Sequence, residues 1–280
     1  MSIELCILAS GSGGNCTVVR TPAGCVLIDA GVGPRAAARR MNGTGVTVGD
    51  VKAICLTHLD SDHFNPCWGE SIRSQGMTLF CHLSRIDDLI GRAGEDLREC
   101  IVGFEGPFEP LSGLRFGPLS LAHDQTGSHG FLIEGFDSRI GYATDLGWVT
   151  AELIERFCDL DVLALESNYD PQMQMDSPRP AFLKQRIMGG RGHLSNQQAF
   201  AAVRRILDRH ELAGVPLPSH VVLLHRSRQC NCPKLLRKLF LSDVRLSNRL
   251  TLAEQFQRSE WLRVGRLRPL IGEQLVLGWG

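Results

Sequence analysis

The feature that most constrains this chain is a group of metal-ligand side chains directly after a predicted buried strand. The segment 53–64 reads AICLTHLDSDHF, and its apolar start predicts the strand. Four such side chains follow: His58, Asp60, Asp62 and His63. Imidazole and carboxylate are ligands that first-row metals prefer, and this spacing at a strand end lets several converge on one ion. The alternative is a polar loop that holds these side chains by coincidence.

Later strands are also predicted to end at polar residues of this kind. Apolar segments at 119–123, 140–144, 162–166 and 221–224 each lead into a polar turn. The residues at or just after these strand ends are His123, Asp145, Asn168 and His225. Taken singly, each is explained as well by an ordinary loop. Taken in order with the first group, they indicate metal ligands gathered from successive strand ends.

The remaining chain predicts short strands and amphipathic helices with glycine-rich turns between them. Further strands are expected at 3–9, 17–20, 25–29, 77–81, 114–116 and 130–134, and the strands described above extend over 51–57 and 139–144. Helices are expected at 34–41, from 65 onward, and at 85–89, 196–209 and 233–240. No internal repeat, low-complexity tract or linker interrupts this order, so residues 1–280 are predicted to form one domain.

Composition favours a globular protein without a membrane segment. Apolar residues make up 43% of the chain, and no apolar run approaches the length of a bilayer-spanning helix. The N-terminus lacks a basic region and carries Glu4, so it predicts a first strand rather than a signal peptide. The ten cysteines are scattered and predict reduced thiols in a cytoplasmic protein. Cys230 and Cys232 are close enough to bind a metal together, but two unlinked thiols explain them better.

The zero formal net charge hides an asymmetry along the chain. Residues 179–280 contain 18 Lys/Arg and 6 Asp/Glu, a balance of +12, so residues 1–178 carry −12. A basic C-terminal third favours anionic substrates, including nucleic acid. An ordinary arginine-rich helical surface explains the same count equally well.

Several polar residues are candidates for holding a phosphate group. The loop SGSGGN (10–15) offers backbone N–H groups and hydroxyls, although it lacks the ending of a P-loop. Ser195 is the predicted N-cap of the helix at 196–209, where an anion is favoured. Arginine side chains suit bidentate phosphate contact. The candidates are Ser10, Ser12, Asn15, Asn168, Ser195, Arg226 and Arg228.

This ordered set of residues resembles the signature of the metallo-β-lactamase fold, which is HxHxDH, then a lone His, an Asp and a final His. The matching residues are His58, Asp62, His63, His123, Asp145 and His225. The resemblance implies an α+β fold, a four-layer αββα sandwich with a two-metal site along one edge. Segments LASGSGGNCT (8–17), ESNYD (166–170), GHLSN (192–196) and LLHRSRQCN (223–231) are similar to the YycJ/WalJ-like branch of this fold, which groups with nucleic-acid-cleaving members.

The resemblance implies two divalent metal ions and a role for each matched residue. The first metal would bind His58, Asp60 and His123, the second would bind Asp62, His63 and His225, and Asp145 would bridge them. Asp62 would also orient or deprotonate the attacking water, and His193 in GHLSN would donate a proton. A helix-capping histidine without chemistry is the alternative for His193.

The chain departs from the family signature at Asp60, which stands where the second His is usual. An aspartate there still offers an oxygen ligand but makes the site harder, which favours Mn or Fe beside Zn. It also allows a weakened site with one metal or a degenerate site. Asp29 is either an acid that orients a metal ligand or a strand-end cap.

The resemblance therefore implies a dinuclear metal-dependent phosphodiester hydrolase in which a metal-activated hydroxide attacks phosphorus. A nuclease of the 5′-to-3′ DNA exonuclease type is the leading hypothesis, with nucleic acid, DNA rather than RNA, as substrate. One alternative is a hydrolase of small esters, thioesters or cyclic phosphates, because one fold hosts many chemistries. The other is a non-catalytic metal-binding protein whose site Asp60 has broken.

Overall fold

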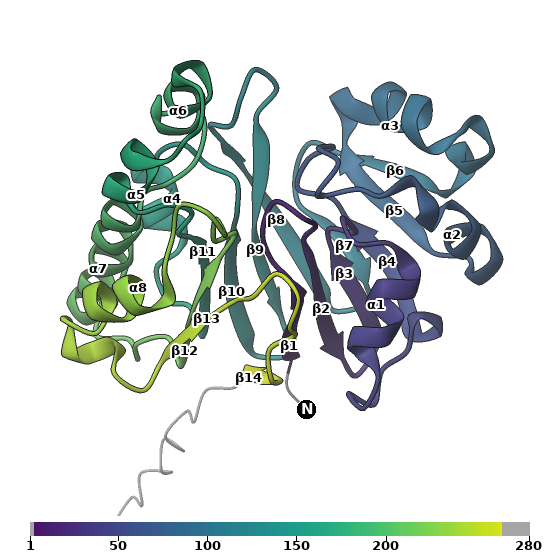
Figure 1. Cartoon of the computed structure of the whole chain (residues 1–280). Coiled ribbons are helices and arrows are strands. Elements are labelled where there is room, and N and C mark those ends of the chain that lie inside the picture. The colour runs from purple at the N-terminus through teal and green to yellow at the C-terminus, as the bar shows by residue number, and fades with distance from the viewer. Residues whose placement is uncertain (1–2, 265–280) are drawn as a thin grey trace, which may run out of the picture.

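Two β-sheets packed face to face form the centre of the molecule, and helices cover both outer faces (Figure 1). The computed structural model describes residues 3–264. This four-layer αββα arrangement is the one expected from the sequence. The two sheets are built largely from consecutive halves of the chain, so each half brings its own strand ends to the same edge of the sandwich.

The first sheet has seven strands in the order β14-β1-β2-β3-β4-β5-β6. Its N-terminal strands are antiparallel neighbours, whereas β3 to β6 pair in parallel. The strands are β1 (Ile3–Ala9), β2 (Cys16–Thr21), β3 (Gly24–Ile28), β4 (Val51–Cys55), β5 (Thr78–His82), β6 (Ile101–Phe104) and β14 (Leu262–Val264).

The second sheet also has seven strands, in the order β13-β12-β11-β10-β9-β8-β7. Strands β10 to β13 are parallel neighbours, and β7 to β10 form an antiparallel meander. The strands are β7 (Phe108–Leu111), β8 (Leu114–Leu121), β9 (Ser128–Gly135), β10 (Ser138–Ala143), β11 (Val162–Glu166), β12 (His220–Leu224) and β13 (Leu250–Leu252).

Helices flank the sheets on their outer sides (Figure 1). Beside the first sheet lie α1 (Pro34–Met41), α2 (Gly69–Gln75) and α3 (Ile86–Ala93). Beside the second lie α4 (Ala151–Arg156), α5 (Pro171–Asp176), α6 (Ala181–Met188), α7 (Asn196–Leu212) and α8 (Pro233–Phe240). Short 3₁₀ turns occur at Val48–Asp50, Pro66–Trp68, Leu83–Arg85, Glu95–Cys100 and Val244–Leu246.

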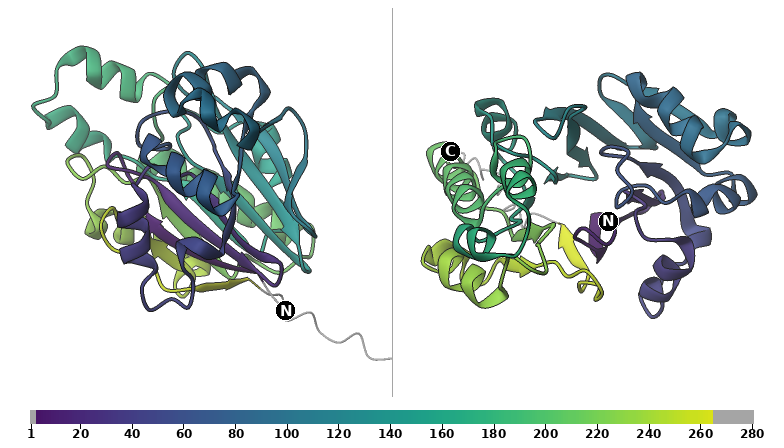
Figure 2. Two further views of the ribbon diagram at one scale, coloured as in Figure 1. Left: turned by 90° about the vertical axis from the view of Figure 1, so that its right-hand side faces the viewer. Right: turned by 45° about the horizontal axis from the view of Figure 1, so that its top comes forward.

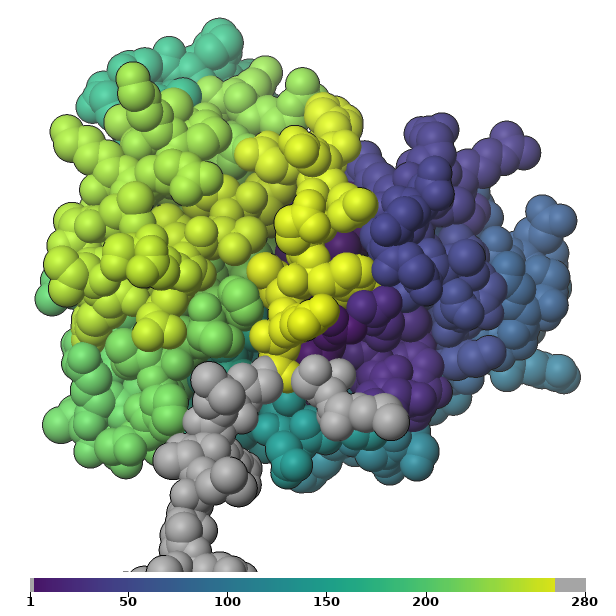
Figure 3. Space-filling model, turned by 90° about the horizontal axis from the view of Figure 1, so that it is seen from below, coloured from purple at the N-terminus to yellow at the C-terminus, as the bar shows by residue number. Residues whose placement is uncertain are grey.

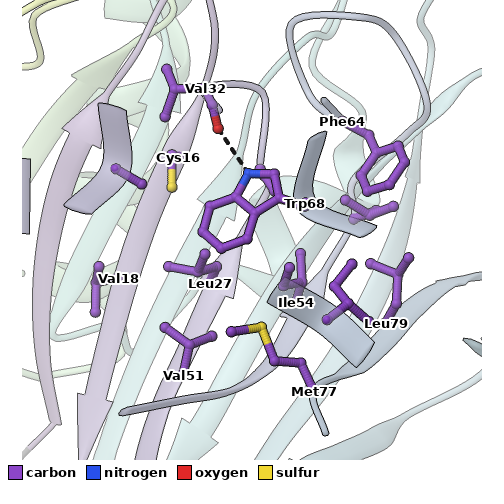
Figure 4. Close-up of a cluster of buried hydrophobic side chains, with 14 of the residues drawn as sticks. Cys16, Val18, Leu27, Val32, Val51, Ile54, Phe64, Trp68, Met77 and Leu79 are labelled. Carbon is purple, nitrogen blue, oxygen red and sulfur yellow. Dashed lines mark hydrogen bonds between the residues drawn. The ribbon is translucent and has the colours of Figure 1, made fainter. Parts of the chain in front are cut away.

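The strands are apolar on both faces because each sheet is buried on both sides. In β1, Ile3, Leu5 and Ile7 pack between the sheets, whereas Cys6 and Leu8 face the helices, as the two-residue period of a strand requires. Figure 4 shows the helix-facing layer around Trp68, whose indole N–H donates to the carbonyl of Val32 at 2.8 Å. The layer between the sheets takes side chains from both of them.

The C-terminal segment of the described chain lies against the start of the chain. Strand β14 pairs antiparallel with β1, and Figure 3 shows this yellow segment beside the purple N-terminal strand. The backbone N–H of Ser259 donates to the carbonyl of Ile7, and the hydroxyl of Ser259 accepts the backbone N–H of Ile7. The last described strand therefore covers what would be the open edge of β1.

Most predicted elements are present, but two of the predicted strands form one, and strands β6, β7, β13 and β14 were not predicted. Helices at 34–41 and 233–240 have the expected bounds, and the predicted segments at 114–116 and 119–123 belong mostly to one strand, β8. Helices α4, α5 and α6 were not predicted. All ten cysteines are free thiols, including Cys230 and Cys232. Between residues 3 and 264, no helix has the length and apolarity needed to cross a membrane.

Candidate metal centre and cleft

The candidate site lies where the strands of both sheets end. Residues 58–63 follow β4, His123 follows β8, Asp145 follows β10, and His225 follows β12. In the second sheet the parallel register aligns these ends, since Ala143 pairs with Leu165 and Glu166 with Leu224. The predicted ligands thus come together from distant parts of the chain.

The loop 58–63 is held by the neighbouring loops of the first sheet. Gly31 is required there, because a Cβ on it would meet the carbonyl oxygen of Asp62 at 1.7 Å. The same carbonyl accepts the backbone N–H of Asn15 at 2.7 Å, and His63 C=O accepts the N–H of Ala30 at 2.8 Å. These backbone contacts hold the loop in place.

The first cluster consists of His58, Asp60 and His123. Asp60 Oδ2 lies 3.9 Å from His58 Nε2 and 4.0 Å from His123 Nε2, and the three ligand atoms can share one ion. His58 Nε2 is buried and has no hydrogen-bond partner. A buried nitrogen without a partner, facing other ligand atoms, is what a metal site requires, so these residues fit a divalent cation.

The second cluster consists of Asp62, His63 and His225. Asp62 Oδ2 lies 3.2 Å from His225 Nε2 and 3.8 Å from His63 Nε2. His63 and His225 are buried, whereas the Asp62 side chain reaches the cleft. This is the second ligand set expected from the sequence, and its three atoms also lie within reach of one ion.

Asp145 lies between the two clusters. Its Oδ2 is 2.9 Å from His63 Nε2, and its Oδ1 is 4.0 Å from His123 Nε2 and 3.4 Å from His225 Nδ1. It also groups with His58 and His63 as a potential ligand set. The carboxylate that was predicted to bridge two metals is therefore placed within reach of both clusters.

Buried partners hold the imidazole rings in place. Asp29 Oδ2 lies 2.8 Å from His63 Nδ1, and its Oδ1 accepts the backbone N–H of Thr57 at 2.8 Å. The carbonyl of Gly192 lies 2.9 Å from His123 Nδ1. Such partners fix the tautomer and orientation of a ligating histidine. Of the two roles open to Asp29, the geometry supports the one that orients a ligand.

The backbone at these strand ends is unusual. Asp29, Asp145 and His225 have φ values of 59°, 51° and 50°, a left-handed conformation that is uncommon outside glycine. Each costs free energy, on the order of 1–3 kcal/mol, that the surrounding fold must supply. Residues kept in this conformation cluster at functional sites, which agrees with the placement of these three.

Glu166 is a site residue that the sequence analysis missed. It is fully buried at the end of β11, and its Oε2 accepts the backbone N–H groups of Leu146 and Leu194, both at 3.1 Å. Its Oε1 lies 2.7 Å from His193 Nδ1 and 3.3 Å from His225 Nδ1. The only sign of this role in the sequence was the position of Glu166 at the end of a predicted strand. Because both oxygens already accept hydrogen bonds, Glu166 is better suited to orient the histidines than to bind an ion.

The carboxylates make the site favourable for positive charge. Burial alone lowers the pKa of His225, but Asp145, Asp62 and Glu166 raise it to about 10. Burial raises the pKa of Asp62, yet the hydrogen bond from His225 and the charges of His63 and His225 together outweigh this and hold the pKa at about 2. Burial and the neighbouring His63 lower the pKa of His58 well below its usual value, which leaves a neutral ring able to bind an ion.

The cleft over these clusters has a volume of about 440 Å³. Predicted site residues that line it include Asp60, Asp62, His123, Asp145, Asn168, His193, His225 and Ser12. Two arginines that were not predicted also line it, Arg179 and Arg186. They come from the segment around α6, which the sequence analysis left unassigned.

Most of the predicted phosphate-holding residues have structural partners instead. The Ser10 hydroxyl accepts the backbone N–H of His225 at 2.7 Å, and Ser195 caps α7 in a capping box. Arg226 pairs with Glu254, and the guanidinium of Arg228 lies over the ring of Phe256 at 4.7 Å.

Neither Arg226 nor Arg228 lines the cleft, because each side chain is engaged on the C-terminal segment. Asn15 lies just beneath the cleft, with its Nδ2 2.9 Å from His63 Nε2. Only Ser12 and Asn168 of the seven candidates line the cleft itself. Asn168 also donates to the carbonyl of His225 at 2.7 Å.

The fold and the ligand clusters define a hydrolase of the metallo-β-lactamase type, and comparison with known proteins agrees. Residues 25–222 match the family described as the beta-lactamase superfamily domain. The chain belongs to this family. The match begins within β3 and ends within β12, so it includes every predicted ligand except His225.

Two named relatives match over most of their length. The chain is 24% identical over 260 residues to exodeoxyribonuclease YycJ of Bacillus anthracis, covering 92% of this chain and 94% of the relative. It is 25% identical over 244 residues to exodeoxyribonuclease WalJ of Streptococcus pneumoniae, covering 85% and 87%. The resemblance to the YycJ/WalJ-like branch is thereby confirmed.

Solved structures confirm the fold. The metallo-beta-lactamase fold protein YhfI from Bacillus subtilis superimposes with a TM-score of 0.68 at 16% identity, covering 93% of this chain and all of that one. A diphosphatase from the PhnP family gives a TM-score of 0.65 at 15% identity, covering 95% and 99%. Family, relatives and ligand clusters together identify the chain as a metal-dependent hydrolase.

Proposed function

We propose that this protein hydrolyses phosphodiester bonds of nucleic acid, as a 5′-to-3′ DNA exonuclease with two divalent ions, Zn or Mn, or Fe. The observation that supports this best is the pair of ligand clusters on either side of Asp145 beside His193, with residues of both clusters lining one cleft. The two named relatives described above are exodeoxyribonucleases. The basic C-terminal third, which supplies Arg179 and Arg186, suits an anionic substrate.

The bound ions would supply an activated water and would stabilise charge on the attacking and leaving oxygens of the phosphate. His58, Asp60 and His123 would hold one ion, and Asp62, His63 and His225 the other, with Asp145 shared. The carboxylate of Asp62 would also orient the water, since it faces the cleft. Asp29 and the Gly192 carbonyl keep two of the ligating rings oriented.

His193 is placed to give a proton to the leaving oxygen. Its ring lines the cleft and its Nδ1 lies 2.7 Å from Glu166 Oε1, which leaves Nε2 for the substrate. Burial lowers the pKa of His193, but the carboxylates of Glu166 and Asp145 outweigh this and raise the pKa above its usual value, which favours a ring that can donate a proton. This geometry favours the proton-donating role over a histidine that only caps a helix.

A second candidate is a hydrolase of small phosphate esters. A cleft of about 440 Å³ is large enough for a single nucleotide-sized molecule, and a diphosphatase shares the fold. The non-catalytic alternative required Asp60 to break the site. Against it, Asp60 Oδ2 lies within 4.0 Å of both histidines of its cluster.

The first test is metal content per chain, measured by elemental analysis for the wild type and Asp60→His. We expect two ions in both proteins, because the aspartate already supplies an oxygen ligand. Asp87→His, an exposed change on α3, is the matched control and should leave the metal content unchanged. One ion or none in the wild type, restored to two by Asp60→His, would support the degenerate site.

The second test is the substrate. We expect processive shortening of single-stranded DNA from its 5′ end, followed with oligonucleotides labelled at either end, with Mn and Zn compared. Hydrolysis of mononucleotide esters without any attack on oligonucleotides would contradict the nuclease and favour the small-ester hydrolase.

A further inference from the structure

Helices α5 and α6 form an arm beside the cleft. The arm, residues 171–188, lies between the end of β11 and His193, and Figure 2 (left) shows these two green helices standing out from the body of the molecule. No residue of the arm belongs to the three large hydrophobic clusters that pack the sheets and their helices. Its position raises the question of what it contributes.

The arm is attached to the site at both ends. At its start, Asp170 caps α5, accepting the N–H groups of Gln172 and Met173 at 3.0 Å. At its end, the N–H of His193 donates to the carbonyl of Ile187 at 3.0 Å. Gly192 packs so closely that a Cβ would meet the Ile187 carbonyl oxygen at 2.4 Å. The arm is therefore fixed in position relative to the proton donor.

Helix α6 presents two different faces. Leu183 and Ile187 belong to a small cluster with Tyr169 and Cys230 and line the metal cleft. On another face, Phe182 and Gln185 line an adjoining hollow of about 690 Å³. Because positions 182, 185, 186 and 189 follow the helical spacing, they share one side of α6.

The hollow continues the metal cleft. Asp60, Asp124 and Arg186 line both of them, so the two spaces meet beside the first ligand cluster. Arg186 bonds to the carboxylate of Asp124, with its Nε 3.0 Å from Oδ1, and its side chain remains 62% exposed. Arg191 adds a second cation to the lining.

Phe182 is the feature that internal packing does not explain. Its side chain is 72% exposed, although burying a phenylalanine is usually favourable. An exposed aromatic ring next to arginines, along a path to a phosphodiester-cleaving site, is the composition of surfaces that bind single-stranded nucleic acid. Bases stack on the ring, and guanidinium groups contact the phosphates.

We propose that this face of α6 is a binding surface for the single strand that enters the cleft. Phe182 would stack on a base a few nucleotides from the scissile bond, and Arg186 and Arg191 would contact the adjacent phosphates. This proposal rests on the proposed nuclease function. It adds the route by which single-stranded DNA would reach the metal cleft, which is along this face of α6. A duplex would present no open base face to Phe182, so the surface selects single strands.

The test combines a protein variant with a substrate variant. Binding of a single-stranded DNA 10-mer to the metal-loaded protein is measured with Ca²⁺ in place of the catalytic ion, for wild type and Phe182→Ala. We expect Phe182→Ala to weaken binding by about 5- to 150-fold, the range for losing one stacked base. Phe182→Trp should bind at least as well as the wild type.

An abasic nucleotide, moved along the 10-mer, locates the stacked base. At one position it should weaken binding to the wild type but not to Phe182→Ala, because the same contact is already lost. Leu212→Ala, which truncates another exposed apolar side chain on α7, is the matched control and should bind as the wild type does. Turnover of bis(p-nitrophenyl) phosphate by Leu212→Ala should also equal that of the wild type.

The outcomes separate this inference from the proposed function. If the wild type binds and shortens oligonucleotides and Phe182→Ala does so equally well, the strand path is wrong and the nuclease stands. If the wild type neither binds nor cleaves oligonucleotides, the nuclease is wrong and the strand path with it. Equal losses at every abasic position would also overturn the assignment to Phe182.

Discussion

The two sheets supply the candidate site in different ways. The first sheet gives four side chains from a single loop, residues 58–63 after β4. The second sheet gives one residue at a time, at the ends of β8, β10, β11 and β12. The loop depends on local backbone contacts such as the close approach of Gly31 to Asp62. The second set depends on strand register across the sheet.

The two sheets should therefore differ in how many ions are lost when one of their ligands is replaced. In the proposed assignment each ligand of the loop binds one ion, although His58 and His63 also group with Asp145, so the loss of Asp60 or Asp62 should affect mainly one ion. Asp145 from the second sheet lies within reach of both clusters, and its loss should affect both ions. In the proposed site, the second sheet would therefore couple the two metal positions through Asp145, whereas Asp60 and Asp62 of the first sheet would each serve one position.

Replacing Asp145 should have the largest effect. We expect Asp145→Asn to lose both ions and to lower phosphodiester hydrolysis on the order of 10³-fold or more, beyond the 10–100-fold typical of groups outside the ligand set. Asp62→Asn should lose one ion only. Elemental analysis and initial rates at saturating metal measure both effects.

The matched control is another aspartate with a left-handed backbone conformation. Asp137 also has a positive φ, 57°, but lies in an exposed turn, and Asp137→Asn should retain full metal content and activity. If Asp145→Asn keeps two ions, the carboxylate is not shared, and the proposed coupling between the sheets fails.

The next comparison concerns the packing of the two sheets. Trp68 is fully buried in the helix-facing layer of the first sheet. The buried residues of this layer come from the first sheet and its helices and not from the second sheet. We expect Trp68→Ala to lower the free energy of unfolding by about 3–5 kcal/mol, because a large cavity replaces the indole. Trp148→Ala, at a half-exposed tryptophan beside the second sheet, should change it by about 0.5 kcal/mol or less.

Denaturant unfolding followed by circular dichroism gives both values. Hydrogen exchange in β11 then reports on the second sheet. Faster exchange there in Trp68→Ala would show that the sheets unfold together through the layer between them. Unchanged exchange in β11 would mean that the first sheet opens alone.

The sequence predicted the loop ligands more securely than their surroundings. His58 to His63 stand within six residues, so their proximity needed no tertiary information. His123, Asp145 and His225 were placed through the family resemblance, and the structure brings them to the same clusters. The four-layer fold followed from that resemblance together with the order of strands.

The errors have a common physical cause. Arg226 and Arg228 follow His225 directly, yet their side chains are held by Glu254 and Phe256, residues of a segment that no local pattern links to them. Glu166 was overlooked because an acid at a strand end is ambiguous until its hydrogen-bond partners are known. The arm was missed because α5 and α6 are short, and α6 leaves Phe182 exposed instead of forming one apolar stripe.

The smallest of these effects should come from Glu166→Gln, which tests how the second sheet supports His193. The amide keeps the shape, and its oxygen can still accept the backbone N–H groups of Leu146 and Leu194, but it removes the negative charge beside the His193 ring. We expect metal content to stay at the wild-type value and turnover of DNA to fall about 10–100-fold, as for other groups that orient active-site histidines.

The leaving group separates orientation of a proton donor from a general structural loss. An alkoxide leaving from DNA needs a proton, whereas p-nitrophenolate leaves without one, so bis(p-nitrophenyl) phosphate turnover should fall much less in Glu166→Gln. His193→Ala should show the same selectivity, and the double variant should be little worse than His193→Ala alone. Equal losses on both substrates would instead mean that Glu166 maintains the ligand clusters, and the second sheet would then hold the metals through it as well as through Asp145.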